Sequence, residues 1–184
     1  MQMDKSTLKT EAIFADDRKR RYLLRKEWNP KEAKAMVIML NPSTADVVKL
    51  DYTTLYILNN IQDLSFGRVD IVNLFSLMTK KLKSEEIELA LEEKNLAQIH
   101  KSAQEADSVI IAWGKSGENN QKLRYMQTLL LEQLHSYRDK LYIIGNGMGE
   151  SGFHPLAPQV RFFWELLPFD IEAYLEKIRC TKEK

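Results

Sequence analysis

Residues 36–46 read Met-Val-Ile-Met-Leu-Asn-Pro-Ser-Thr-Ala-Asp, and this stretch decides the fold. Its five leading apolar residues include the β-branched Val37 and Ile38. Such a run predicts a strand buried on both faces, as in a parallel sheet. Pro42 lacks an N–H and biases Asn41 away from the helical region, so the strand ends there. Open α/β sheets bind ligands just beyond such strand ends. The polar residues Ser43, Thr44 and Asp46 therefore mark a candidate site, or alternatively only a turn and a helix cap.

Strands and helices alternate along the rest of the chain. The patterns predict further strands over 67–75, 107–114 and 140–145, and helices over 51–64, 85–104, 121–135, 160–167 and 171–178. Asp51 and Ser84 are placed to cap the first two helices. Residues 11–14 and 21–28 could form an antiparallel hairpin at the sheet edge. This order predicts a three-layer α/β/α fold with a central, mainly parallel four-stranded sheet.

The composition is that of one globular domain over residues 1–184, with residues 1–10 flexible and 180–184 a polar tail. Hydrophobic residues make up 44% and charged residues 29%, which excludes a disordered chain. The net charge of +1 gives no global field for nucleic acid, although a local basic patch stays open. The single cysteine, Cys180, excludes an intramolecular disulfide and a cysteine-rich metal site.

The sequence predicts a cytoplasmic protein without a membrane partner, a cofactor or a metal. No apolar run reaches the length that spans a bilayer, and residues 1–10 lack the apolar core of a signal peptide. His100 and His135 fall on predicted helices, away from the loops, which argues against a histidine metal cluster.

Four loops are expected to meet at the carboxyl edge of the sheet. They carry Asn41 to Asp46, Asn73, the run from Trp113-Gly114-Lys115, and the glycine-rich stretch 145–158 with Asn146. Glycines there could bring backbone N–H groups close to a ligand. His154 could act as a general acid or stabilise a developing anion, although a lone loop histidine is more often structural.

A basic stretch at 18–26 is interleaved with aromatic residues. On a regular strand one face would carry Arg21, Leu23 and Arg25, and the other Tyr22, Leu24 and Lys26. Basic residues beside aromatics suit phosphate contacts and base stacking. The alternative is an edge strand whose charged side chains prevent pairing with another chain.

Familiar catalytic signatures are absent from the sequence. It has no P-loop, no dinucleotide Gly-x-Gly-x-x-Gly, no Gly-x-Ser-x-Gly and no His-Glu-x-x-His. Ser43 as a nucleophile would need a base, for which His154 is the candidate, so serine hydrolysis remains a minor alternative.

Most of the chain resembles a bacterial and phage family known as domain of unknown function 1643, which implies no particular reaction. The resemblance rests on Arg21-Tyr22-Leu23-Leu24-Arg25 with Trp28, Met39-Leu40-Asn41-Pro42-Ser43-Thr44-Ala45-Asp46, Asn73-Leu74-Phe75, Ala112-Trp113-Gly114 and His154-Pro155-Leu156.

The order of motifs is also similar to the uracil-DNA glycosylase superfamily. That resemblance implies that Asn41 positions the attacking water, Asn73 binds the base edge and His154 stabilises the departing base. Leu156 stands where the superfamily has a phosphate-gripping serine, and no aromatic residue follows Asn41-Pro42.

Together these observations predict a DNA- or nucleotide-acting protein that could hydrolyse the N-glycosidic bond of a modified base. The alternatives are a non-catalytic nucleotide- or base-binding module and a structural or partner-binding domain. The expected catalytic residues are Asn41, Asp46 and His154. The expected substrate-binding residues are Pro42, Ser43, Thr44, Asp51, Asn73, Trp113, Gly114, Asn146 and Pro155, and the expected nucleic-acid contacts are Arg21, Arg25 and Lys115.

Overall fold

A computed structural model describes residues 1–79, 82–83, 87 and 91–182 of the chain. The fold is mixed α/β, as expected, but the sheet has seven strands rather than four. The strands are β1 (Lys9–Phe14), β2 (Arg21–Glu27), β3 (Ala33–Met39), β4 (Phe66–Asn73), β5 (Ser108–Ile111), β6 (Leu141–Gly145) and β7 (Glu165–Pro168). Their order across the sheet is β1-β2-β4-β3-β5-β6-β7.

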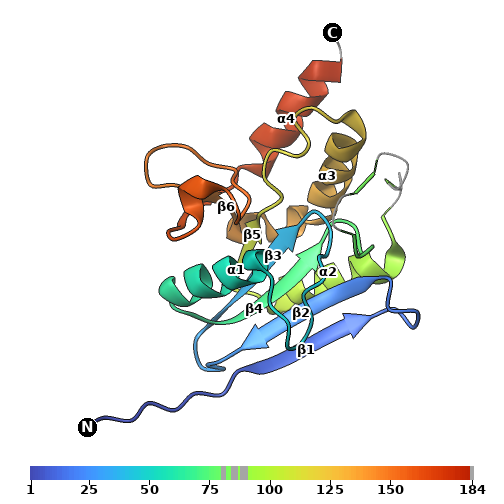
Figure 1. Ribbon diagram of the computed structural model, residues 1–184. Helices are drawn as coiled ribbons and strands as arrows, with labels where there is room; N and C mark the ends of the chain where they lie inside the picture. The colour runs from blue at the N-terminus through green and yellow to red at the C-terminus, as the bar shows by residue number, and fades with distance from the viewer. Residues whose placement is uncertain (80–81, 84–86, 88–90, 183–184) are drawn as a thin grey trace.

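The four strands expected from apolar runs form the parallel middle of the sheet. Val37 of β3 lies opposite Ile71 of β4 on one side and Ile110 of β5 on the other, and β6 follows β5 in parallel. The predicted hairpin is present, because β1 pairs with β2 in antiparallel orientation and β2 continues onto β4. Figure 1 shows β1 and β2 along one edge of the sheet, with the last helix at the far end of the molecule.

The missed strand is β7, at the other edge. It pairs antiparallel with β6, with Leu166 opposite Ile144. The sequence placed a helix over 160–167, but only a short 3-10 turn, η3 (Pro158–Val160), precedes the strand. The apolar residues of this segment are compatible with the periodicity of a helix or of a strand. Pairing with β6 makes the segment a strand.

Helices cover both faces of the sheet. α1 (Tyr52–Asp63) packs Ile57 and Ile61 on one face, in a core shared with Val37. The other face is covered by α2 (Glu93–Glu105), α3 (Gln121–Gln133) and α4 (Ile171–Lys182) through a core that includes Ile99 and Met126. A 3-10 helix, η2 (His135–Lys140), links α3 to β6.

Three element boundaries differ from those predicted from the sequence. The long helix predicted over 85–104 begins at Glu93 instead, and its predicted cap at Ser84 falls outside the described residues. Residues 180–182, assigned to a polar tail, belong to α4, and residues 9–10 belong to β1. In the described part of the chain no helix combines the length and apolar character needed to cross a bilayer.

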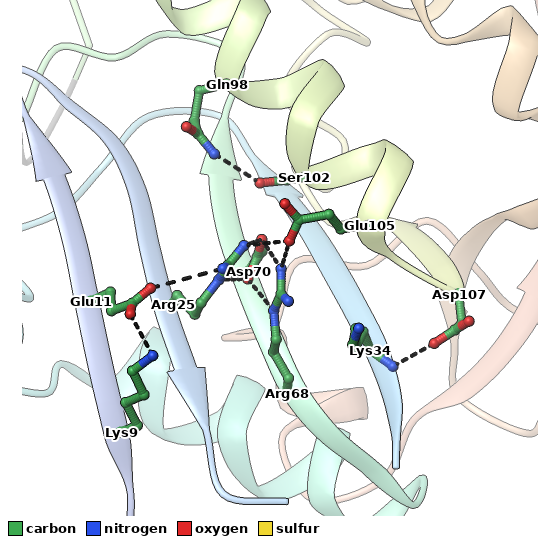
Figure 2. A network of polar contacts seen from close by, with 10 residues as sticks. All are labelled: Lys9, Glu11, Arg25, Lys34, Arg68, Asp70, Gln98, Ser102, Glu105 and Asp107. Carbon is green, nitrogen blue, oxygen red and sulfur yellow. Dashed lines mark hydrogen bonds and ion pairs between the residues drawn. The ribbon is translucent and has the colours of Figure 1, made fainter. Parts of the chain in front are cut away.

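A buried charge network fastens β2 and β4 to α2. Asp70 of β4 accepts two hydrogen bonds from Arg25, each at 2.7 Å, and two from Arg68, each at 3.0 Å. Glu105 of α2 pairs with both arginines, at 3.1 Å to Arg25 and 2.5 Å to Arg68 (Figure 2). Glu11 of β1 lies 3.8 Å from Arg25 and extends the network to the edge strand.

Candidate functional site

Hydrogen bonds hold the segment after β3 against the segment after β4. The Asn41 side-chain amide donates to the Thr79 carbonyl at 2.7 Å and to the Pro42 carbonyl at 3.3 Å. The Thr79 backbone N–H returns a bond to the Pro42 carbonyl at 3.2 Å. Because both bonds use the amide N–H groups, the Asn41 oxygen remains as the acceptor of a fixed side chain.

Asp51 links this loop to α1. One carboxylate oxygen accepts the Thr54 backbone N–H at 2.7 Å, which caps the helix as the sequence predicts, and the other accepts the Ser43 hydroxyl. Partial burial raises the pKa of Asp51, but these bonds and the Arg21 charge outweigh it and hold the pKa below its ordinary value. The carboxylate is therefore ionised at neutral pH, and Ser43 donates to an acid rather than to a histidine.

Arg21 is buried beneath the same loop, with 2% of its surface exposed. Its guanidinium donates to the Ala45 carbonyl at 2.5 Å, while its Nε has no hydrogen-bond partner among the described residues. Burial lowers its pKa to about 10, against the opposing charges of Asp51 and Asp46. A buried cation without a full set of acceptors among the described residues is costly and requires an explanation.

A β-bulge explains why Arg21 lies here. The register passes from Leu23, opposite Ile13, to Arg21, opposite Phe14, so Tyr22 is the extra residue. The expected shared face of Arg21, Leu23 and Arg25 is therefore wrong. Arg21 points with Lys26 toward the 45–47 backbone, and Tyr22 bonds Glu92 on the α2 side at 2.9 Å.

Asn73 ends β4 on the same face as Arg21. It pairs in register with Met39, whose side chain packs in the α1 core, so the pleat directs Asn73 to that face. The residue is 1% exposed, and its Nδ2 has no partner among the described residues. Within the described part of the chain, two buried N–H donors thus lack partners on neighbouring strands, β2 and β4.

His154 comes to this edge from the glycine-rich loop. Its Nδ1 accepts the Leu156 backbone N–H at 3.1 Å, so in the neutral ring the proton lies on Nε2. Burial lowers the pKa of His154, and the charge of Asp51 only partly opposes that shift. The ring is therefore neutral at pH 7 and can donate from Nε2. Gly114 makes room for it, since a Cβ added there would lie 3.0 Å from the His154 Cβ.

Other expected site residues shape loops. The Asp46 carboxylate accepts the backbone N–H groups of Val48 and Lys49, each at 2.8 Å. Thr44 is exposed, and Pro42 and Pro155 are buried. Asn146 accepts the backbone N–H groups of Met148 and Glu150 and donates to the Glu150 carboxylate, which closes the turn after β6.

Of the remaining expected residues, Gly114 lies against His154, whereas the others lie away from this cluster. Trp113, Gly114 and Lys115 line a cavity that extends toward α3 and α4 on the other face of the sheet. Arg25 is committed to the Asp70 network (Figure 2). Within the described residues no three histidine, cysteine, aspartate or glutamate side chains gather in a way that could hold a metal ion.

The structure gives two residues at this edge of the sheet, Asp51 and Arg21, surroundings that the sequence alone does not predict. The sequence predicts Asp51 as a cap and as a substrate contact; the structure confirms the cap and also places the Asp51 charge where it acts on His154 and Arg21. The signal was its place as N-cap immediately beyond the Asn-Pro loop. Nothing in the sequence alone marks the bulge that turns Arg21 toward the site.

Comparison with known proteins identifies the family to which the chain belongs. Searches of curated proteins and of solved structures found no match. A family model described as a protein of unknown function, DUF1643, matches residues 21–156, most of the chain. The match begins at the buried arginine of β2 and ends just after His154, so it contains every residue of the cluster. The chain therefore belongs to the DUF1643 family.

Proposed function

We propose that the carboxyl edge of the sheet binds a nucleobase, in a nucleotide or in DNA, and hydrolyses its N-glycosidic bond. The observation that carries the proposal is the buried Asn73 amide, whose Nδ2 lacks a partner among the described residues. Leaving such a donor unsatisfied costs about 1–3 kcal/mol. A base carbonyl would satisfy it, and the motif order resembles that of the uracil-DNA glycosylase superfamily.

The surrounding groups have the properties that this reaction needs. A water held by the Asn41 oxygen would attack the sugar carbon, and its proton would pass to the ionised Asp51. The C–N bond breaks, and its electron pair leaves with the base. The Nε2–H of neutral His154 would donate to the oxygen on which negative charge develops.

The test is release of free base from oligonucleotides and nucleotides that carry a panel of damaged and modified bases. Asp51→Asn retains a capping oxygen but removes the base, so we expect release to fall by about 100-fold or more. The matched control is Asp46→Asn, whose amide oxygen can still accept from Val48 and Lys49; it should remain near wild type.

Histidine variants sharpen the comparison. His154→Gln should lose activity, whereas His135→Gln should not, because the His135 ring pairs with Glu172, away from the proposed site. A wild-type protein that neither releases nor binds any member of the panel would refute the proposal.

A second candidate is a binding module that recognises the base without chemistry. It is favoured because the Asn41 amide and the Asp46 carboxylate, both expected to handle water, are engaged in holding their own loop. Tight binding that is lost in Asn73→Ala, without any base release, would support this function instead.

A further inference from the structure

A separate cavity of about 470 Å³ lies at the ends of β5 and β6, on the face covered by α3 and α4. Its apolar wall consists of Ile111, Trp113, Ile143, Phe169 and Tyr174. All five residues belong to the core of that face or pack against it. This face is opposite to the α1 face, where Asn73 and Arg21 lie. The volume is within the range of small-molecule sites.

One side of this cavity is charged. Lys115 and Arg124 line it together with the single carboxylate of Glu118, so its rim carries an excess of positive charge. Lys115 is exposed to solvent. Arg124 also acts on the far wall, because its charge partly opposes the burial that raises the pKa of Tyr174.

The charged side is held in place before any ligand arrives. Arg124 donates from Nε to the Gly117 carbonyl at 3.2 Å and also bonds the Glu118 carbonyl. A Cβ at Gly117 would lie 2.0 Å from the Gln127 side-chain oxygen, so a larger residue here would displace the Gln127 side chain. Gln127 in turn donates to the Ser116 hydroxyl at 3.2 Å.

We propose that this cavity binds a flat aromatic anion. The indole and phenyl rings of the apolar wall suit stacking against a planar ring system. The two cations suit one carboxylate or phosphate at the rim. An empty defect in a core would be lined by apolar atoms alone, and a site for a neutral apolar ligand would not need two cations. The inference is independent of base hydrolysis, since it uses none of the residues proposed for that reaction.

Calorimetric titration with three probes tests the class of ligand. Adenosine 5′-monophosphate carries an aromatic base and a phosphate, 2-aminobenzoate carries a ring and a carboxylate, and adenosine is neutral. We expect one or both anions to bind more tightly than adenosine. Whichever anion binds more tightly shows whether the site prefers a phosphate or a carboxylate. Binding of adenosine as tight as that of both anions, or no binding of either anion at millimolar concentration, would overturn the proposal.

Charge-reversal variants locate the binding. Lys115→Glu should weaken anion binding by about tenfold or more, whereas Lys122→Glu should not, because Lys122 is exposed on α3 but does not line the cavity. Equal weakening in both variants would indicate a general charge effect and contradict the proposed site. Asp51→Asn should bind the anion as the wild type does, and loss in that variant would assign the binding to the other face.

Discussion

At the scale of single residues, the contact between Gly114 and His154 joins two loops that are distant in sequence. Gly114 has φ +65°, and a Cβ there would lie 3.0 Å from the His154 Cβ. The turn after β5 therefore needs glycine for its conformation and for space. This one position sets how far the imidazole can approach the carboxyl edge.

We predict that Gly114→Ala destabilises the protein by about 1–2 kcal/mol from backbone strain alone, with a further cost from the His154 contact. Chemical denaturation measures the change. Gly149→Ala is the matched control, since φ there is +89° but nothing lies within 4 Å of the added Cβ. Equal losses in the two variants would show that the His154 contact contributes nothing.

The partly buried His154 also predicts a pH dependence. Its pKa in the folded state lies below the ordinary 6.5, so the unfolded chain takes up a proton first as the pH falls. Stability should therefore decrease as the pH drops below about 6.5, until the folded-state pKa is passed. His154→Gln should lack this decrease. Denaturation curves at a series of pH values test it, and parallel pH profiles for the two proteins would contradict it.

At the scale of elements, α1 shows that one carboxylate serves both the fold and the site. Asp51 caps the helix through Thr54 and holds Ser43 at the same time. The helix and its cap could be predicted because the spacing of Leu55, Leu58 and Ile61 is regular and an acid stands directly before it. Its link to His154 depends on a contact between distant segments, which no local pattern encodes.

Substitution can separate these two roles of Asp51. Asp51→Ala should cost about 1–2 kcal/mol of stability through loss of the cap, while Asp51→Asn should cost little. Both should lose base release. Asn120→Ala is the comparison, because Asn120 caps α3 by accepting the Leu123 N–H at 3.1 Å; it should lose stability but keep base release. Unimpaired release by Asp51→Ala would remove Asp51 from the mechanism.

The edge elements were harder to predict than the central strands. The parallel strands are mostly apolar because both of their faces are buried, so sequence reveals them directly, although β4 also carries Arg68 and Asp70. β7 is only half-buried, and Phe162 and Phe163 before it remain exposed. Apolar content therefore misled the prediction of a helix there. The bulge in β2 was equally hidden, since it depends on pairing with Phe14 rather than on composition.

At the scale of the whole molecule, the Asp70 network joins the N-terminal hairpin to the body of the fold. Burial raises the pKa of Asp70, but its bonds to Arg25 and Arg68 outweigh this and hold the pKa below the ordinary 3.8. The Asp70 side chain is 2% exposed. Removing its charge would leave the two arginines with Glu105, and with Glu11 at 3.8 Å from Arg25.

We predict that Asp70→Asn lowers the free energy of unfolding by about 3–5 kcal/mol. The stabilisation by Asp70 is complete above pH 3.8 and is lost as the pH falls through its folded-state pKa, so the variant should lack that acid transition. Thermal and urea denaturation provide the measurements. Asp139→Asn, whose side chain is 93% exposed, should show no measurable change. A similarly small effect at Asp70 would mean that the network contributes little.

The strand order also has a consequence for the growing chain during translation. Once residues 9–73 have left the ribosome, β1, β2, β4 and β3 can pair, yet β3 has no neighbour on its second side until β5 is made. At about 5–20 residues per second this interval lasts roughly 2–8 s. During that time β3, whose residues Met36, Val37 and Ile38 are fully buried in the finished fold, is an open sheet edge. Nascent chains are therefore most exposed to misassembly and to chaperone capture before residues 108–111 emerge.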